Sequence, residues 1–532
     1  MKRSFYITAV ALLTFVFSGC YKDKGNYDYI SLAEVTIETT SGIYTFNQKL
    51  GDHLTIPMTV TVRGGISESD LTYQWDFKNS AVFRDLEGHT GKNFDRDLGP
   101  DGYFNTYGTF ITRLRATWVE NGFTFEAFSP LISIVLSGDP GLMVLHGDNT
   151  GLDVGMVIDN MFLVLAASST TEKVVYNSYS SVNGSRIPGE GITVIQQDNT
   201  NVANAWCFVL TDLGMVFFEP VNFQKLGDYD DLFFSVSGRK YYQGKPEAIF
   251  CWSPRAVIDS GDIFYQFAGS QFGLRTEFIW SGVNYLPEYK VSKHAIFANG
   301  RGITNLVAFD ELQRRIIRFG TLSTGGSSNV LWLFDSNNGP FNLNNMQADL
   351  LHLSWGGMIS NQDNFVGVFK DDTDELFLGE FRVTGADAVN NTWAQFKYSV
   401  DLLPNFADAK FYGFGITNNL CYYATDNAVY QFGLAGATGT TVGRKLLYGI
   451  DSPVDFPFSG EITMMKVFRP SLSSMTAATY YHLYGEVLLV GTYENGEGTL
   501  YAIRLSQGNG NAISYKSWGG FGRIYDADLK TR

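Results

Sequence analysis

The stretch FVLTDLGMVFF, residues 208–218, decides the fold class. Two apolar runs, each about the length of a strand, flank the turn Asp212-Leu213-Gly214. Aromatic and β-branched residues favour strands, whereas Asp and Gly favour the tight turns between them. The stretch therefore predicts a β-hairpin with apolar strands.

The same pattern occurs seven times after Leu142. It covers Met143–Val157, Phe208–Phe218, Ala256–Phe267, Val307–Phe319, Val366–Phe381, Tyr422–Phe432 and Val487–Leu505. The starts lie 65, 48, 51, 59, 56 and 65 residues apart, a period of about 57 that suits four strands with long loops. We therefore predict a seven-bladed β-propeller over residues 141–532, because a ring of blades leaves few exposed sheet edges. A jelly roll and a β-solenoid are the alternatives.

Residues 30–137 predict a separate, smaller β-sandwich, which makes the whole protein all-β. Its expected strands are Ala33–Glu38, His53–Arg63, Leu71–Phe77, Thr109–Glu120 and Phe123–Leu136. The segment LTYQWDF, residues 71–77, resembles a strand of the PKD-type immunoglobulin-like fold, which implies that Trp75 packs between the two sheets. Lys78-Asn79-Ser80 stands where that fold usually has Gly-Asp-Gly, so the resemblance is to a divergent branch. The segment SGDPG, residues 137–141, marks the domain boundary.

The first 20 residues predict export and lipidation. A basic start, an apolar run over residues 5–17 and the sequence Phe17-Ser18-Gly19-Cys20 resemble a bacterial lipobox, which implies acylation of Cys20. Residues 21–29 predict a tether, in which Lys22 and Asp23 resemble a signal for the outer face of the outer membrane. An ordinary signal peptide and a periplasm-facing lipoprotein are the alternatives. Several acyl chains on one cysteine anchor a protein without a transmembrane helix.

The composition narrows the range of partners. Lys and Arg number 39 against 54 Asp and Glu, a net charge of −15 that disfavours nucleic acid and bare anionic lipid. Cys207, Cys251 and Cys421 are odd in number and far apart, so we expect buried free thiols and no zinc site. A Cys207–Cys251 bridge is the less favoured alternative.

Motifs for catalysis are missing from the sequence. It has no G-x-S-x-G, H-E-x-x-H, P-loop or dinucleotide signature, and its six histidines lack metal-ligand spacing, so we predict no catalytic residue, metal or cofactor. The acidic run Asp371–Glu375 is expected to be a solvated turn, with calcium binding as the alternative. Among the tryptophans, Trp280 and Trp355 lie near loop-like stretches, and we predict that they are exposed and bind a ligand.

Three segments together resemble the PKD-like lipoprotein family of gut bacteria. They are the start at Cys20–Tyr29, the junction GLMVL at residues 141–145, and the ending GFGRIYD at residues 520–526. The resemblance implies a surface accessory of a starch-utilisation-type (SusCD-like) system, beside a TonB-dependent transporter and its substrate-binding lipoprotein lid. A glycan or a peptide would be the ligand. A propeller-type glycan hydrolase or lyase, and an adhesin or scaffold protein, are the alternative functions.

Overall fold

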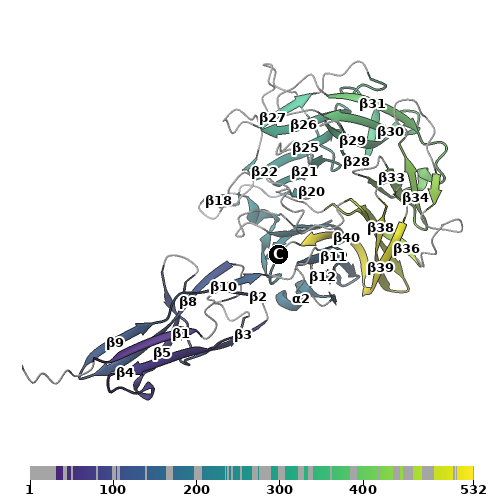
Figure 1. Cartoon of the computed structure of the whole chain (residues 1–532). Helices are drawn as coiled ribbons and strands as arrows, with labels where there is room; N and C mark the ends of the chain where they lie inside the picture. The colour runs from purple at the N-terminus through teal and green to yellow at the C-terminus, as the bar shows by residue number, and fades with distance from the viewer. Residues whose placement is uncertain are drawn as a thin grey trace, which may run out of the picture. The chain divides into compact units, whose positions relative to one another are not determined.

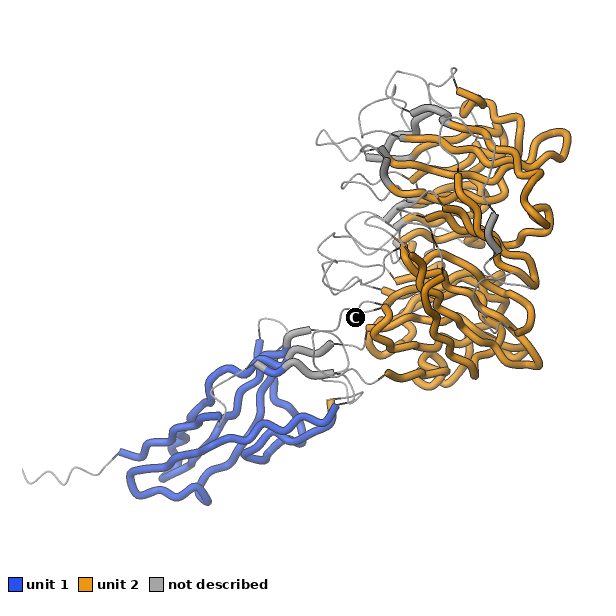
Figure 2. Tube along the Cα trace, turned by 45° about the vertical axis from the view of Figure 1, so that its right-hand side comes forward, with its two compact units in different colours: residues 1–48, 52–97, 109–135 blue, residues 49–51, 98–108, 136–532 orange. Residues whose placement is uncertain are grey.

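The computed structural model describes residues 32–39, 45–49, 52–78, 82–98, 104, 108–137, 140–162, 172–196, 206–233, 235–236, 239–240, 244–251, 255–266, 273–274, 289–297, 306–321, 329–333, 339–359, 362–383, 392–415, 420–434, 444–446, 459–469, 485–506, 510 and 512–530. The chain divides into two compact units (Figure 2). Unit 1 takes in residues 1–48, 52–97 and 109–135, and unit 2 takes in residues 49–51, 98–108 and 136–532. Strands dominate both, so the predicted all-β class is confirmed. No helix in these ranges is long and apolar enough to cross a membrane.

Unit 1 contains three β-sheets within the described ranges. In the two small sheets, β1 (Glu34–Thr39) pairs with β4 (Met58–Arg63), and β3 (His53–Ile56) pairs with β7 (Phe94–Asp97). The large sheet has the order β2 (Thr45–Lys49), β10 (Ile132–Ser137), β8 (Gly108–Glu120), β5 (Thr72–Lys78) and β6 (Arg84–Asp85), and β9 (Phe123–Phe128) also pairs with β8. All five predicted strand segments are therefore confirmed, and 53–63 and 123–136 each contain two strands.

Trp75 lies at the centre of unit 1. Its side chain is fully buried, and its Nε1 donates a hydrogen bond to the Gly91 carbonyl oxygen at 3.2 Å. The ring meets Phe94 edge-on, with 5.2 Å between the ring centroids. A buried indole needs such a partner for its N–H. The prediction that Trp75 is a core residue is confirmed.

Unit 2 contains seven four-stranded sheets in the part of the chain that the structure describes, here named sheets 1 to 7. Sheet 1 is β13 (Lys173–Val175), β12 (Gly151–Ile158), β11 (Gly141–Asp148) and β40 (Arg523–Lys530); sheet 2 is β14 (Gly191–Gln196), β15 (Cys207–Thr211), β16 (Gly214–Phe218) and β17 (Lys225–Asp228). Sheet 3 is β20 (Pro246–Cys251), β21 (Arg255–Asp259), β22 (Asp262–Gln266) and β23 (Gly273–Leu274); sheet 4 is β24 (Ile296–Phe297), β25 (Leu306–Asp310), β26 (Arg315–Thr321) and β27 (Asn329–Leu333).

The remaining three sheets follow in chain order. Sheet 5 is β28 (Ala348–Ile359), β29 (Gln362–Asp371), β30 (Leu376–Val383) and β31 (Thr392–Ser399); sheet 6 is β32 (Phe411–Phe414), β33 (Leu420–Ala424), β34 (Val429–Gly433) and β35 (Arg444–Leu446). Sheet 7 is β36 (Glu461–Val467), β37 (Val487–Glu494), β38 (Glu497–Leu505) and β39 (Ala512–Phe521). Short elements accompany them: the strand pair β18 (Ser235–Val236) and β19 (Arg239–Lys240), the helix α2 (Ser178–Asn183), and the 3-10 turn η3 (Tyr229–Leu232).

The seven predicted hairpins are all present, and each forms the middle pair of one sheet. In sheet 2, for example, β15 and β16 pair in register from Cys207 opposite Phe218 to Thr211 opposite Gly214. The middle strands are apolar at successive positions because both of their faces are buried. Leu142 and Val144 of β11 pack in one hydrophobic cluster, whereas Met143 and Leu145 pack in another. A strand buried on both faces reads as a continuous apolar run.

Each sheet packs on the next through one such cluster. Six clusters join sheets 1 and 2, 2 and 3, 3 and 4, 4 and 5, 5 and 6, and 6 and 7. A seventh joins sheet 7 to sheet 1, with Leu489 of β37 and Leu500 of β38 beside Val144 of β11 and Leu529 of β40. The order of packing among the described sheets is therefore cyclic.

Sheet 1 is built from both ends of unit 2. Figure 1 shows β40, from the C-terminal end of the chain, beside β11 and β12. The register runs from Gly141 opposite Lys530 to Gly147 opposite Arg523, with a bulge after Leu145. The last strand of the chain thus completes the first sheet of unit 2.

Deleting residues 523–532 is expected to abolish the cooperative unfolding transition of unit 2. The deletion removes one strand of sheet 1 and takes Ile524, Ala527 and Leu529 out of the cluster between sheets 7 and 1. Thermal unfolding and limited proteolysis measure the effect. The control is deletion of residues 531–532 alone, which lie beyond β40; a full-length-like transition in the longer deletion would contradict the role of β40.

Candidate functional site

A group of charged and polar side chains gathers where β40 meets β14 and β36. Asp526, Asp528 and Lys530 alternate along β40 and are all buried. Ala527 and Leu529, between them, belong to the apolar cluster between sheets 7 and 1. Successive side chains of a strand point to opposite faces, so the three charged residues share one face of β40. We call Asp526, Asp528, Lys530, Lys466, Thr193 and Gln196 the closure cluster.

Asp526 is the best connected member of the closure cluster. Its Oδ2 accepts hydrogen bonds from the Thr193 hydroxyl at 2.6 Å and from the Val194 backbone N–H at 3.0 Å. Its Oδ1 lies 2.7 Å from Nζ of Lys466 in β36. One carboxylate therefore holds three strands of three different sheets together.

The closure cluster also accepts hydrogen bonds from backbone N–H groups at an unpaired sheet edge. β14 is the last strand of sheet 2 on that side, so alternate N–H groups have no neighbouring strand to bond. Asp526 accepts from the N–H of Val194, and Asp528 accepts from the N–H of Gln196 at 3.4 Å. The two carboxylates and the two N–H groups have the same spacing of two residues. Buried backbone donors need such partners.

The electrostatics of the closure cluster differ between its two carboxyl groups. Burial raises the pKa of Asp528 to about 7; the positive charge of Lys466 opposes this rise, and the negative charge of Asp526 adds to it. Burial lowers the pKa of Lys466, but the charges of Asp526 and Asp528 outweigh that effect and the pKa is raised. The Lys466 side chain is 32% exposed, so its ammonium keeps some access to water. Near neutral pH the cluster can therefore exchange a proton at Asp528.

Two partly buried histidines, His294 before β24 and His352 in β28, form a separate group. His352 in β28 lies 2.7 Å from the Ser354 hydroxyl through Nε2, and its ring stacks on Phe414 of β32 at 6.1 Å between centroids. The ring centroids of His294 and His352 are 6.3 Å apart. Burial lowers the pKa of His352 to about 3 and of His294 to about 4, so both rings are neutral at pH 7.

A third histidine has a structural role at the closure of sheet 1. The Nδ1 atom of His146 accepts the Gly522 N–H at 3.0 Å, and Nε2 lies 2.7 Å from the Tyr176 carbonyl oxygen. These contacts require a neutral ring with its proton on Nε2. They support the prediction that the histidines are structural. Within the described ranges, no group of three or more His, Cys, Asp or Glu residues gathers as a metal would need.

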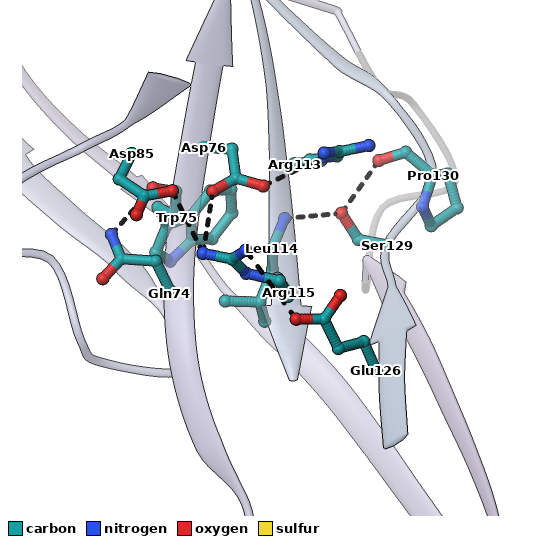
Figure 3. Close-up of polar contacts among 10 residues, drawn as sticks. All are labelled: Gln74, Trp75, Asp76, Asp85, Arg113, Leu114, Arg115, Glu126, Ser129 and Pro130. Carbon is teal, nitrogen blue, oxygen red and sulfur yellow. Dashed lines mark hydrogen bonds and ion pairs between the residues drawn. The ribbon is translucent and has the colours of Figure 1, made fainter. Parts of the chain in front are cut away.

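Unit 1 has its own ion-pair network around the buried Asp76, shown in Figure 3. Asp76 of β5 is almost fully buried and accepts from Nε of Arg113 at 3.1 Å, while Arg115 lies 3.6 Å from its other oxygen. Arg115 also contacts Asp85 at 3.0 Å and Glu126 at 3.8 Å. Burial raises the pKa of Asp76, and the hydrogen bond with Asp85 adds to this rise against the two arginines. The network ties β5, β6 and β9 to β8.

The acidic run Asp371–Glu375 is the turn between β29 and β30. Asp371 Oδ1 accepts from the Thr373 N–H and hydroxyl at 2.9 and 2.7 Å, and from the Glu375 N–H at 3.0 Å. Asp372 pairs with Arg314, and Asp374 pairs with Lys370. Asp371 thus accepts hydrogen bonds from its own turn, as Asp commonly does. These contacts agree with the prediction of a solvated turn.

Other turns use aspartate in the same way. Asp212 Oδ1 accepts the Glu190 N–H at 2.6 Å, one residue before β14, and Asp310 Oδ1 accepts the Lys290 N–H at 3.0 Å. Asp310 also accepts from Nε of Arg315 at 2.8 Å. Asp212 and Asp310 therefore each hold the chain that leads into the first strand of the same sheet.

The predicted site residues have different outcomes. Cys20, Lys22, Asp23 and Trp280 lie outside the described residues. The prediction that Trp355 is exposed is wrong: it is 6% exposed, packs between sheets 4 and 5, and donates from Nε1 to Asp363 at 2.8 Å. The stretch beside Trp355 that the sequence suggested was loop-like, Gly356-Gly357, is part of a β-bulge within β28. The expectation of buried free thiols at Cys207, Cys251 and Cys421 is confirmed.

Sequence reasoning missed the closure cluster. Asp526-x-Asp528-x-Lys530 is a charged run that alternates with the apolar residues Ala527 and Leu529, and this alternation was the available signal. Lys466 and Thr193, the partners of Asp526, lie 60 and 333 residues from it in the sequence. Nothing in the spacing of these residues indicates that they meet.

Comparison with known proteins supports one family resemblance. Residues 20–191 match the sequence model of the PKD-like family, a range that covers the described strands of unit 1 and the first hairpin of unit 2. The predicted resemblance to a PKD-like family is confirmed over that range. None of the curated proteins matches this sequence.

Three solved structures are similar at low scores. A complex of BBS1N with ARL6DN has a TM-score of 0.34 and 11% identity, covering 63% of this chain and 88% of that one. The fission yeast SREBP-SCAP binding domains have a TM-score of 0.31 and 10% identity, with coverages of 66% and 83%. The Hadza microbial sialidase Hz136 has a TM-score of 0.23 and 7% identity, with coverages of 94% and 88%. These scores are too low to carry an argument.

Replacing Asp528 by Asn is expected to flatten the pH dependence of stability. Because the folded-state pKa is raised to about 7 from 3.8, the folded protein holds a proton that the unfolded chain has lost between those pH values. The stability contribution of this group therefore falls as pH rises from about 4 to about 7, by up to roughly 4 kcal/mol, and Asp528→Asn lacks this loss.

Urea unfolding at pH 5 and pH 8 measures the difference between the variant and the natural protein. Asp526→Asn is the matched control, because it removes a charge from the same strand and with it the ion pair with Lys466. It should destabilise the protein at both pH values. A pH profile of Asp528→Asn that parallels the natural protein would contradict the raised pKa.

Proposed function

We propose that residues 141–532 form a seven-bladed β-propeller with sheets 1 to 7 as its blades. The cyclic series of seven hydrophobic clusters supports this arrangement. In it, β40 is the innermost strand of the first blade and comes from the opposite end of the chain to β11, β12 and β13. A ring closed in this way leaves each blade with only its innermost and outermost strand edges unpaired.

We propose that the protein is a surface-exposed lipoprotein of an outer membrane and a non-enzymatic accessory subunit of a SusCD-like nutrient-uptake complex. The lipobox-like sequence ending at Cys20 and the Lys22-Asp23 pair support the location. The match of residues 20–191 to the PKD-like family supports the kind of protein. The molecule would bind a glycan or peptide, or dock on a TonB-dependent transporter with its lipoprotein lid.

The observation that carries the non-enzymatic part is that three buried carboxylates are hydrogen-bonded within the fold. Asp526 accepts from Lys466, Thr193 and Val194; Asp310 accepts from Arg315 and backbone N–H groups. Asp153 caps α2 by accepting from the Tyr179 and Ser180 N–H groups at 3.2 and 3.1 Å. Carboxylates engaged by the fold have little capacity left for a substrate, whereas most glycoside hydrolases need a pair of carboxyl groups free to act as acid and base. A binding or docking role requires an exposed surface but no free catalytic carboxylates.

Cys20→Ala is expected to release the protein from the membrane, because acyl chains on Cys20 are its proposed anchor. Metabolic labelling with an alkynyl fatty acid and cell fractionation measure the change. The double variant Lys22→Ala/Asp23→Ala is the matched control: it should keep the acyl label but lose accessibility to protease added to intact cells. Continued membrane association of unlabelled Cys20→Ala would overturn the anchor.

Affinity purification from detergent-solubilised outer membrane is expected to recover a TonB-dependent transporter with the tagged protein. The recovered complex should survive Asp528→Asn, which leaves the exterior of unit 2 unchanged. Mass spectrometry identifies the partners, and calorimetry with glycan and peptide panels identifies the ligand class. Repeated recovery of the protein alone, or turnover of a panel member, would count against an accessory binding role.

A further inference from the structure

The hairpin of β8 and β9 ends in an exposed apolar tip. Phe123 is 81% exposed, Val119 is 63% exposed and Phe125 is 39% exposed, and all three lie within four residues of the turn at Asn121-Gly122. Both turn residues have positive φ, 50° and 82°, as a tight two-residue hairpin turn requires. Exposed aromatic side chains on a strand attract other surfaces.

The apolar residues occupy both faces of this tip. Phe125 lies opposite Trp118, and Phe123 lies opposite Glu120, so these four side chains share one face. Val119 lies opposite Thr124 on the other face. A flat protein surface covers one face of a hairpin, whereas the interfacial layer of a bilayer surrounds both faces of an inserted tip.

The tip lies at the end of unit 1 from which the N-terminal chain leaves. Glu34, at the start of β1, pairs with Arg63, at the end of β4. From Arg63 the short link through η1 (Glu68–Asp70) leads to Thr72, which pairs with Thr117 near the end of β8. β1 and β9 are in contact, and Figure 1 shows them side by side.

The length of the tether brings this end to the membrane. Leu32, the first described residue, follows Cys20 by twelve positions. Twelve residues span at most about 40 Å when fully extended. A protein held by acyl chains on Cys20 therefore keeps the β8–β9 tip within reach of the bilayer surface.

We propose that the tip formed by Trp118, Val119, Phe123 and Phe125 contacts the interface of the lipid bilayer and orients unit 1 on the membrane. This inference rests on the proposed lipid anchor. Aromatic side chains favour the interfacial region, where their apolar area leaves water without entering the hydrocarbon core. The anchor supplies the affinity, and the tip supplies the orientation.

The charges around the tip select the kind of lipid. The same end of unit 1 carries Glu34, Glu68, Asp70 and Glu120 against Arg63 and Lys92. The excess of carboxylates disfavours an anionic surface. On vesicles, the contact is therefore expected to weaken as the fraction of anionic phospholipid rises.

The test places a fluorescent label at the tip and measures whether the label contacts lipid. The full mature chain carries Cys20→Ser, an N-terminal polyhistidine tag bound to nickel-chelating lipid in phosphatidylcholine vesicles, and Phe123→Cys with an environment-sensitive fluorophore. The three described cysteines are buried, which directs labelling to the new thiol. Ile513→Cys in β39, at a position 58% exposed, is the matched control.

The expected result is a blue shift of the label at position 123 and quenching by a nitroxide on the lipid headgroup region, with no change at position 513. Adding Val119→Ser and Phe125→Ser should weaken this tip–lipid contact about tenfold. A label at 123 that stays in water on vesicles, or that responds only when outer-membrane proteins are added, would overturn the inference.

The chelated tag separates the two proposals. If tethered protein shows no lipid contact, the tip proposal fails while acylation of Cys20 is unaffected. If mass spectrometry of the native protein finds no acyl chain on Cys20, the lipid anchor fails whatever the label reports.

Discussion

The pairing of β40 with β11 is the constraint on which unit 2 depends. It joins residues from the two ends of a segment of about 390 residues, and without it sheet 1 would lack one of its four strands. The pairing is stabilised on both faces of β40. Ala527 and Leu529 enter the apolar cluster with sheet 7, whereas Asp526 and Asp528 bond the open edge of sheet 2. Bringing distant ends together costs conformational entropy, so the contacts at this seam must be numerous.

The two faces of β40 contribute in different ways. Apolar burial stabilises β40 but does not select its register, because the hydrophobic effect is non-directional. The carboxylates fix the register of β40 against β14, because they bond backbone N–H groups spaced two residues apart. A shift of one residue would place Ala527 at the donors of β14 and turn Asp526 and Asp528 towards the apolar cluster. The closure cluster is thus a device for choosing one alignment, and this use of its charges agrees with a protein that works through surfaces.

Unit 1 divides its residues between an inward and an outward role along the same strands. Trp75 and Leu114 are fully buried where β5 and β8 pair, and the Asp76 network stabilises the other face. Beyond Thr117, β8 pairs with β9 alone, and Val119, Phe123 and Phe125 are exposed there. The exposed tip therefore lies where the β8–β9 hairpin continues past its pairing with β5.

The sequence by itself determined the strands that are apolar on both faces. Local sequence pattern predicts the hairpin at 208–218, its six counterparts, the buried Trp75 and the three buried thiols. These predictions do not depend on which neighbouring element covers the residue, because an apolar residue in such a strand is buried in any packing order. Tertiary structure decided the rest. Trp355 is buried because a bulge at Gly356-Gly357 continues β28 where the glycines suggested a loop. Asp526 meets Lys466 and Thr193 only because the cyclic packing brings β36, β40 and β14 together. Long-range partners of charged residues depend on that order of packing, and no local periodicity encodes it.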